Sequence, residues 1–174
     1  MKRVFLIGYM GAGKTTIGKA LARDLNVEFF DLDWYIEDRF RKKISDIFEE
    51  SGEQGFREME YKMLREVGEF ENVVISCGGG TPCFFDNIDF MNSRGATIYL
   101  KATPAVLKEH LLMGKSQRPL INGKSPEELE CYIKESLVKR TPFYEKAKHA
   151  IDIDVIHTKE QIDSYVKKII DIVK

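Results

Sequence analysis

One segment near the N-terminus combines residue types and spacing that suit the binding of phosphate. Residues 8–15 read Gly-Tyr-Met-Gly-Ala-Gly-Lys-Thr and match the pattern G-x-x-x-x-G-K-[ST]. Glycines in such a turn let backbone N–H groups surround phosphate oxygens, and a following helix N-terminus adds a positive dipole end. Lys14 can then reach the β and γ phosphates of a nucleoside triphosphate, and the Thr15 hydroxyl can bind Mg²⁺. The segment predicts a site for a nucleoside triphosphate with one Mg²⁺ ion.

Two acids have the spacing to serve the group that receives the phosphate. Asp31 and Asp33 end an expected strand, and if that strand runs on through them, residues two apart point to one face. Ligands of open α/β sheets bind at the carboxyl ends of the strands. One acid could hold Mg²⁺ through water while the other accepts the proton of a substrate hydroxyl. A pair of solvated turn acids would show the same spacing, so both interpretations stay open at this point.

Three arginines stand apart from the charged faces of the expected helices, at Arg57, Arg118 and Arg140. A guanidinium group matches the geometry of a carboxylate or a phosphate better than an ammonium group does. A run of three glycines, Gly78–Gly80, would let a backbone approach a ligand closely. Composition alone equally fits solvated surface arginines and a flexible glycine turn, so these residues are candidates.

The elements that must position these side chains alternate along the chain. Short apolar runs predict five strands, over residues 4–7, 28–31, 73–76, 96–100 and 151–154. The phosphate-binding segment falls between the first of these strands and a stretch of helical spacing over residues 14–25. This alternation predicts an α/β fold of the P-loop NTPase type, a three-layer sandwich with a five-stranded parallel sheet flanked by helices. We expect a single P-loop kinase domain over residues 1–174.

Capping residues mark the starts of three further helices. Thr103 precedes a first-turn proline, Ser125 precedes a proline and a capping-box acid, and Thr158 opens a capping box with Gln161. Pro142 is expected to break or kink the helix that begins after Ser125, close to Arg140.

Composition and charge exclude several classes of protein. The 27 Lys and Arg residues balance 28 Asp and Glu residues, which leaves a net charge of −1 and no general attraction to nucleic acid or to an anionic membrane. The apolar run at residues 4–7 is too short for a signal peptide or a membrane span. The three cysteines lack a C-x-x-C pair, so neither a disulfide framework nor a zinc site is expected. We expect a cytoplasmic monomer that acts on small molecules, with no nucleic-acid or membrane partner.

Seven blocks, in order, resemble shikimate kinase. They are residues 8–15, 31–33, 44–48, 52–60, 78–80, 118–120 and 140–144. Each block is weak alone, but the ordered set is specific and spans the chain from Met1 to about His157. The resemblance implies transfer of the γ-phosphate of ATP to the 3-hydroxyl of shikimate, on the route to chorismate and the aromatic amino acids.

The resemblance also implies a nucleotide site and a metal site. The ATP phosphates would be bound by Gly11, Ala12, Gly13, Lys14, Thr15 and Thr16. Thr15 would bind Mg²⁺ directly, and Asp31 would support the metal through water. Arg118 would come from a mobile lid over residues 113–124 and meet the phosphates, and it would join Lys14 and Asp33 as a catalytic residue.

The acceptor site implied by the resemblance lies partly in a helical segment over residues 33–60. Asp33 would hold the shikimate hydroxyls and is the best candidate base. Further contacts would come from Arg57 and Arg140, which clamp the carboxylate, from the backbone of Gly79, from Glu60, which orients Arg57, and from Phe48 and Phe56, which wall the ring.

The sequence departs from the family pattern around the adenine. Family members often have a basic residue shortly before the lid that stacks on the base, whereas this chain has His110-Leu-Leu-Met. The later loop, which can carry an arginine, reads Val-Ile-His157-Thr here. His110 and His157 are candidate substitutes, and each also fits an ordinary, partly exposed histidine.

Three competing interpretations fit the sequence less well. Gluconate kinases share the first block but lack the Phe-Arg block at residues 56–57 and the triple glycine, and nucleoside monophosphate kinases have an arginine-rich lid where residues 113–124 hold one arginine. A GTPase would show an Asn-Lys-x-Asp motif, which is absent from the sequence. A binding protein without activity would not need the intact set of Lys14, Thr15, Asp31 and Asp33.

Overall fold

The computed structural model describes residues 2–114 and 122–174. Within them, five strands form one parallel sheet in the order β2-β3-β1-β4-β5. The strands are β1 (Arg3–Ile7), β2 (Glu28–Asp31), β3 (Val73–Ser76), β4 (Ala96–Lys101) and β5 (His149–Asp152). The apolar runs of β1 and β3 pair in register from Arg3 with Val73 to Leu6 with Ser76, and both strands are buried on both faces. The expected parallel sheet with five strands is therefore confirmed.

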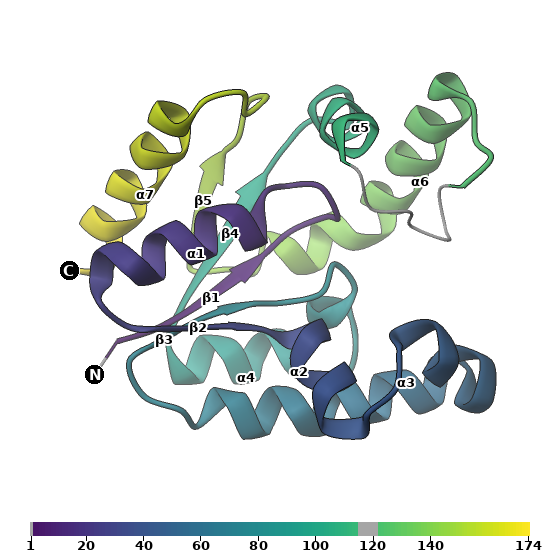
Figure 1. Ribbon diagram of the computed structural model, residues 1–174, viewed down its shortest axis with the longest axis horizontal. Helices are drawn as coiled ribbons and strands as arrows, with labels where there is room; N and C mark the ends of the chain where they lie inside the picture. The colour runs from purple at the N-terminus through teal and green to yellow at the C-terminus, as the bar shows by residue number, and fades with distance from the viewer. Residues whose placement is uncertain (1, 115–121) are drawn as a thin grey trace.

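Helices cover both faces of the sheet (Figure 1). On one side lie α1 (Lys14–Leu25) and α7 (Lys159–Val173), which pack against each other, and on the other lie α3 (Ile44–Gly68) and α4 (Asn87–Arg94). The remaining elements are α2 (Leu32–Phe40), α5 (Pro104–Met113), α6 (Pro126–Tyr144) and a short 3₁₀ helix, η1 (Thr81–Cys83). This arrangement confirms the expected three-layer sandwich.

The capping residues start helices where the sequence predicts them. Thr103 accepts a hydrogen bond from the backbone N–H of Val106, and Ser125 and Thr158 each form a complete capping box. The helix expected over residues 14–25 has the same bounds in the structure. These caps stabilise the N-termini of α5, α6 and α7. Helix α5 follows the carboxyl end of β4, and α7 follows that of β5.

Two boundaries differ from those that the sequence predicts. Of the two outcomes expected at Pro142, a break or a kink, the break is wrong, because α6 continues through Pro142 to Tyr144. Pro142 lies in the last turn, and Val138, whose carbonyl it cannot bond, is 77% exposed, so water can satisfy that carbonyl. Strand β5 begins two residues earlier than expected, at His149, because the exposed His149 and Ala150 pair with β4 without contributing apolar side chains to the core.

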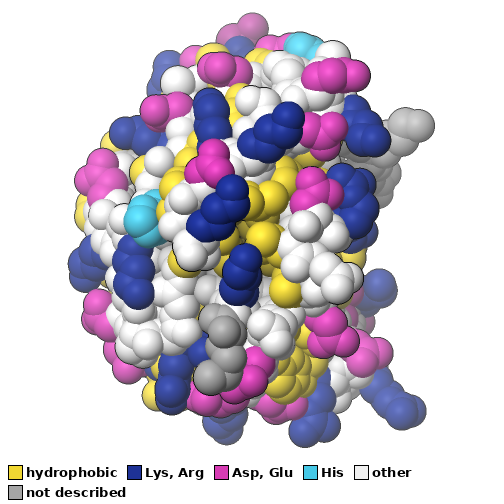
Figure 2. Space-filling model, turned by 90° about the vertical axis from the view of Figure 1, so that its left-hand side faces the viewer, with side chains coloured by type: hydrophobic (Ala, Val, Ile, Leu, Met, Phe, Trp, Pro, Cys, Tyr) yellow, Lys and Arg dark blue, Asp and Glu magenta, His cyan; other side chains and the backbone are white. Residues whose placement is uncertain are grey.

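The face on the left-hand side of Figure 1, where α7 and both termini lie, mixes charges of both signs. Figure 2 shows Lys and Arg side chains on this face interspersed with Asp and Glu, as the nearly equal totals lead one to expect. Among the described helices, none combines the length and the apolar character that a membrane span requires.

Arg3 ties the start of β1 to the ends of two helices. Its Nε donates to the carbonyl of Phe70 at 2.7 Å, Nη1 to that of Arg94 at 2.9 Å and Nη2 to that of Glu69 at 3.1 Å. These carbonyls follow α3 or end α4, where helix backbones lack internal donors. One planar guanidinium thus satisfies three carbonyls at the ends of two helices, at the edge of the sheet opposite the phosphate-binding turn.

Replacing Arg3 by Lys should lower the free energy of unfolding by about 1–2 kcal/mol, because an ammonium group cannot reach three separate carbonyls. Urea denaturation at neutral pH measures the change. Arg94→Lys is the matched control, since Arg94 forms a 2.7 Å ion pair with Glu69 at the surface and should cost less than about 1 kcal/mol. Equal stability of wild type and Arg3→Lys would show that the three contacts do not stabilise the fold.

Candidate active site

A cleft of about 1020 Å³ lies at the carboxyl ends of β1, β2 and β3. Its walls come from the turn after β1, the first residues of α1 and α2, the turn after β3, and parts of α3, α5, α6 and the loop before α7. Parallel strands place all their carboxyl ends at one edge, which is why residues far apart in the sequence meet there. A cleft of this volume is at the upper end of the range for small-molecule sites and can hold a nucleotide and a second small ligand.

The turn after β1 has the backbone that phosphate binding requires. Gly13, the residue before α1, has φ of +92°, in the left-handed region that a side chain disfavours. The Lys14 ammonium group donates hydrogen bonds to the carbonyls of Gly8 at 2.8 Å and Tyr9 at 2.9 Å, among its other contacts. Lys14 is therefore held inside the turn, with its charge next to the N-terminus of α1.

Most of the predicted phosphate-binding residues line the cleft. They are Gly11, Gly13, Lys14, Thr15 and Thr16. Ala12 is buried in the core instead, and its N–H donates to the carbonyl of Tyr9 at 3.1 Å. Ala12 thus stabilises the curvature of the turn.

The two acids reach the cleft by a different route from the one that the spacing suggests. Strand β2 ends at Asp31, and Asp33 belongs to the first turn of α2, so the expectation of a continuous strand is wrong. Asp31 caps α2, because its Oδ1 accepts from the backbone N–H groups of Asp33 at 3.1 Å and Trp34 at 3.3 Å. Its Oδ2 accepts from the Thr15 hydroxyl at 2.9 Å. Both acids still line the cleft, since the start of α2 turns Asp33 back toward it.

Asp33 lies where an ionised carboxylate is disfavoured. Burial, followed by the nearby negative charges of Asp31 and Glu60, raises the pKa of Asp33 to about 6. The positive charges of Lys14 and Arg57 act in the opposite direction but do not cancel this effect. Asp33 therefore holds a proton more tightly than an exposed aspartate, and it is still largely ionised at neutral pH.

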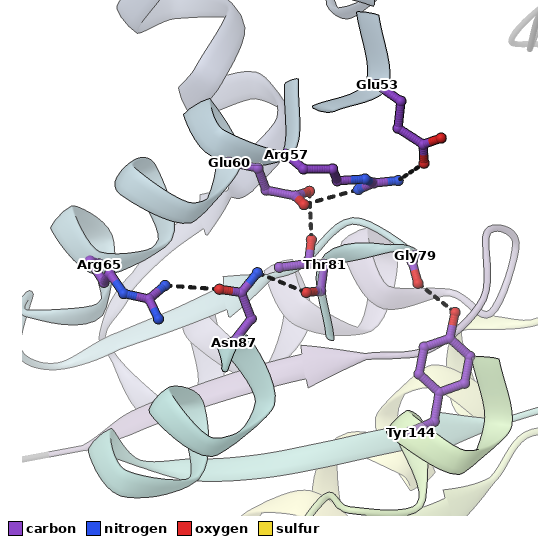
Figure 3. Close-up of polar contacts among 8 residues, drawn as sticks. All are labelled: Glu53, Arg57, Glu60, Arg65, Gly79, Thr81, Asn87 and Tyr144. Carbon is purple, nitrogen blue, oxygen red and sulfur yellow. Dashed lines mark hydrogen bonds and ion pairs between the residues drawn. The ribbon is translucent and has the colours of Figure 1, made fainter. Parts of the chain in front are cut away.

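Arg57 is fixed by a chain of contacts that Figure 3 shows. Its Nη1 donates to Oε1 of Glu60 at 2.9 Å, and its Nη2 lies 3.6 Å from Oε1 of Glu53. Both Arg57 and Glu60 are buried, and burial raises the pKa of Glu60 above its usual range against the opposing effect of Arg57. Among the described residues, the buried Nε of Arg57 has no hydrogen-bond partner. Arg57 as a residue lines the cleft and places a positive charge beside it.

The same network continues into the turn after β3. The Thr81 hydroxyl donates to Oε2 of Glu60 at 2.8 Å, and the buried Asn87 donates from Nδ2 to the Thr81 carbonyl at 2.9 Å. Arg65 in turn donates to Oδ1 of Asn87 at 2.8 Å (Figure 3). The chain of contacts locks η1 and the glycines before it against α3.

Arg140, on α6, approaches the turn after β3 at residues 78–80, which we call the glycine turn. A Cβ placed on Gly79 would lie 3.2 Å from Nη1 of Arg140, and one on Gly80 would lie 2.5 Å from Nη2 of Arg57. The guanidinium groups of these two arginines, which are far apart in the sequence, therefore lie next to adjacent residues of one turn. The turn also touches the phosphate-binding segment, because the same Cβ on Gly79 would lie 3.4 Å from the backbone nitrogen of Met10.

Two aromatic side chains predicted for the acceptor site also line the cleft. The rings of Phe48 and Phe56 lie 4.6 Å apart between centroids and border the cavity beside Arg57. The Arg57 guanidinium lies over the rings of Phe56 at 5.1 Å and Phe84 at 4.2 Å. Phe84 was not among the sequence candidates.

Three further residues of the cleft and its support were not among the candidate site residues: Thr81, Asn87 and Tyr144. The Tyr144 hydroxyl donates to the Gly79 carbonyl at 2.5 Å (Figure 3). Tyr144 belongs to the block around Arg140 that carried the family resemblance, and that membership is the signal that could have identified it. Thr81 and Asn87 act through tertiary contacts that no spacing rule encodes.

Most of the predicted lid over residues 113–124 lies outside the described residues. The part outside them is residues 115–121, which include Arg118. On either side, α5 ends at Met113 and α6 begins at Pro126. Arg118 as a ligand of the phosphates and the lid over residues 113–124 stay predictions.

The raised pKa of Asp33 predicts a cost in stability. Between pH 4 and pH 6 the folded state binds the Asp33 proton more tightly than the unfolded state, so this group's contribution to stability falls as the pH rises through that window. Asp33→Asn should remove a penalty of at most about 3 kcal/mol that is fully present above pH 6. The variant should therefore gain stability over wild type from pH 4.5 to pH 7.5, as measured by urea unfolding in metal-free buffer.

Asp38→Asn, an exposed position on the same helix, serves as the control and should show no such gain. A stability difference between Asp33→Asn and wild type that does not change with pH would mean that burial does not disfavour the Asp33 carboxylate.

Comparison with known proteins agrees with this geometry over nearly the full chain. The family model for shikimate kinase matches residues 10–173. A shikimate kinase from Phocaeicola vulgatus is 58% identical over 166 residues, which cover 95% of each chain. A crystal structure of shikimate kinase from Bacteroides thetaiotaomicron superposes with a TM-score of 0.96 at 53% identity, covering 98% of this chain and 97% of the other.

A second solved structure represents a more distant relative. It is a shikimate kinase from Acinetobacter baumannii in complex with shikimate, with a TM-score of 0.85 and 32% identity over 99% of this chain and 93% of the other. The family match, the relatives and the cleft together show that this chain belongs to the shikimate kinase family.

Proposed function

We propose that this chain transfers the γ-phosphate of ATP to the 3-hydroxyl of shikimate, giving shikimate 3-phosphate and ADP. The observation that carries the proposal is the meeting of Arg57 and Arg140 on the glycine turn, beside Asp33 and the phosphate-binding segment. Shikimate is a small monoanion with several hydroxyl groups. Its carboxylate needs a guanidinium partner and its hydroxyls need acceptors, and this cleft offers both.

The phosphate end of the cleft supplies positive potential without covalent chemistry. The N-terminus of α1 and the Lys14 ammonium group lie at the turn after β1, where the triphosphate of ATP would bind. Lys14 would exchange its contacts with the Gly8 and Tyr9 carbonyls for the β and γ phosphate oxygens. Phosphoryl transfer depends chiefly on such positioning and charge stabilisation.

The donor set near Thr15 fits a magnesium ion. The Thr15 hydroxyl and the Asp31 carboxylate lie 2.9 Å apart at the carboxyl end of β2, and both are oxygen donors, which Mg²⁺ prefers. Thr15 would bind the ion directly, and Asp31 would hold it through water. Mg²⁺ bound there would neutralise charge on the phosphates.

Asp33 is the residue we assign as the base. It faces the cleft between the phosphate-binding turn and Arg57, and its raised pKa gives its carboxylate more affinity for a proton than an ordinary aspartate has. A pKa of about 6 leaves it ionised, and so able to accept the hydroxyl proton, at neutral pH. Its position in the first turn of α2 keeps it close to Asp31, and its carboxylate, unlike that of Asp31, takes no part in the capping contacts.

Arg57 and Arg140 are the residues we assign to the shikimate carboxylate. The Arg57 guanidinium lines the cleft and would supply one charged partner, and the Arg140 guanidinium, next to the same turn, would supply another. The Gly79 backbone lies between them, held by Tyr144, and would meet a ring hydroxyl. Phe48 and Phe56 would cover the apolar part of the ring.

The remaining parts of the proposal concern the setting of the enzyme. We propose a monomer as the active unit, because the described residues of one chain already bring together candidate groups for both substrates. The near balance of acidic and basic residues supports small-molecule substrates rather than nucleic acid or a membrane surface. We propose the cytoplasm as its compartment, where ATP is available.

A coupled assay of ADP release tests the proposal. Purified protein with ATP and Mg²⁺ should release ADP in the presence of shikimate, and far less in the presence of gluconate or AMP. Phosphorus NMR of the product should show a new phosphate monoester in an amount equal to the ADP. Release of ADP with gluconate or AMP at the rate seen with shikimate would contradict the proposed acceptor.

The carboxylate clamp predicts the behaviour of two conservative variants. Arg57→Lys and Arg140→Lys should each raise the KM for shikimate by roughly tenfold or more, since each loses a charge-assisted hydrogen bond worth about 1.5–3 kcal/mol. Their effects should not add in the double variant, because both side chains act on one carboxylate. The KM for ATP should change little.

Shikimate methyl ester gives the matching test from the ligand side, because it keeps the hydroxyls and lacks the charge. Wild type should discriminate strongly against the ester, and the double variant much less. Equal rates with acid and ester in wild type would rule out the clamp.

A further inference from the structure

His110, near the end of α5, contacts two segments that both line the cleft but lie far apart in the sequence. Its Nδ1 lies 2.7 Å from the carbonyl oxygen of Gly11, in the phosphate-binding turn. Its Nε2 lies 2.8 Å from the backbone nitrogen of Ile156, in the loop between β5 and α7. One imidazole ring therefore spans from the turn after the first strand to the loop after the last strand.

The two partners fix which ring nitrogen carries the proton. A carbonyl oxygen can only accept, so Nδ1 must carry hydrogen and donate to Gly11. A backbone N–H can only donate, so Nε2 must be bare and accept from Ile156. His110 is therefore a neutral imidazole with both nitrogens in use, and these two contacts distinguish it from the ordinary, partly exposed histidine that its sequence context also allowed.

The loop that holds Ile156 is fixed on its other side by α7. Gln161 accepts from the backbone N–H groups of His157 at 2.8 Å and Thr158 at 3.0 Å, and it donates to the Val155 carbonyl at 3.0 Å. Gln161 thus ties the loop to its own helix, whereas His110 ties it to the phosphate-binding turn. Ile156 also packs close to that turn, since a Cβ on Gly13 would lie 3.2 Å from its Cδ1.

The position of this loop determines which part of the nucleotide it can meet. The triphosphate is assigned to the turn after β1, and the acceptor to the region of Arg57, Arg140 and the glycine turn. Of the remaining described lining residues, Trp34 and Ile44 belong to α2 and α3, the helices that carry Asp33 and Phe48. The others are Met113 and Gly114 at the end of α5, and residues 156–159 with Ile162 in the loop before α7 and its first turn. This is the part of the cleft left for the nucleoside.

We propose that His110 is a positioning residue that fixes the distance between the phosphate-binding turn and the loop beside the nucleoside. The inference rests on the proposed use of ATP and adds a determinant of nucleotide affinity. A ligand that spans both segments gains from their fixed separation, because it need not order them on binding. A ligand that contacts the phosphate-binding turn alone gains nothing from it.

Titration calorimetry with two probes tests this difference. ATP should span both segments, whereas inorganic tripolyphosphate should contact the phosphate-binding turn alone. In His110→Asn, the side-chain amide can still donate to Gly11 but cannot reach Ile156. The affinity for ATP should fall roughly tenfold, the equivalent of about 1.4 kcal/mol. The affinity for tripolyphosphate should stay within about twofold, since the contact to the turn is kept.

His110→Gln tests the opposite arm. Its side-chain oxygen can reach the position of Nε2 and accept from Ile156, but it leaves the Gly11 carbonyl without its partner. Because the link needs both contacts, ATP binding should weaken in this variant as well. The KM for shikimate should not change in either variant, which separates the role of His110 from a general loss of structure.

His149→Asn is the matched control, because His149 is exposed at the start of β5, away from the cleft, and should bind both probes as wild type does. Wild-type affinity for ATP in His110→Asn, or an equal loss for ATP and tripolyphosphate, would overturn the inference. Phosphate transfer to shikimate by the wild-type chain tests the proposed function separately, so the failure of one is distinguishable from the failure of the other.

Discussion

The buried pair of Arg57 and Glu60 is the interaction on which the half of the cleft that we propose for shikimate depends. Both side chains are almost fully covered, and neither charge could be buried without the other. The second carboxylate oxygen of Glu60 accepts a hydrogen bond from the Thr81 hydroxyl, so the pair also fixes the turn that follows β3. Such a pair is weak evidence for stability, because desolvation offsets most of the attraction between the charges. Its effect is to hold one guanidinium in a single orientation beside the cleft.

Neighbouring parts of the cleft leave room for this fixed guanidinium group. The glycines at residues 78–80 leave room for Arg57 on one side and Arg140 on the other, and any side chain at Gly80 would occupy the space of the Arg57 guanidinium. Acidic and basic side chains line this one cavity, and the charges of Asp31, Glu60, Lys14 and Arg57 all act on Asp33. This arrangement lowers stability at Asp33. Burial and the negative charges of its neighbours raise the pKa of Asp33, so the free protein is less stable at neutral pH than it would be with an amide at this position. A site that holds a reactive carboxylate in place commonly carries such a cost.

The sequence predicts the sheet and the phosphate-binding turn well because both follow from local rules. Apolar runs such as that of β1 have few alternatives to a buried strand, and the G-x-x-x-x-G-K-T pattern between a strand and a helix defines one backbone shape. The prediction that the strand continues through Asp33 was wrong. Asp31 can cap a helix as well as end a strand, and in the structure it accepts the capping hydrogen bonds that start α2. The error left the functional expectation intact, since both routes bring Asp33 to the same edge of the sheet.

The contacts that only the structure reveals are those that join distant segments through single side chains. Nothing in the spacing of His110 indicates that it bridges Gly11 and Ile156, and nothing in the spacing of Asn87 indicates that it supports Thr81. Such contacts depend on how helices pack after the sheet has formed, which the local pattern does not encode. They determine how precisely the cleft is shaped, whereas the local patterns determine where it lies.

The most direct test of this account is the affinity of a Gly80→Ala variant for shikimate, measured by titration calorimetry alongside its affinity for ATP. Gly80 has φ of −89°, so alanine fits its backbone, and the added methyl group would lie 2.5 Å from Nη2 of Arg57 and must displace the guanidinium. The account predicts that shikimate affinity falls by roughly tenfold or more, the scale of one charge-assisted hydrogen bond, while ATP affinity stays unchanged. Wild-type affinity for shikimate in this variant would contradict the claim that a fixed Arg57 recognises the acceptor.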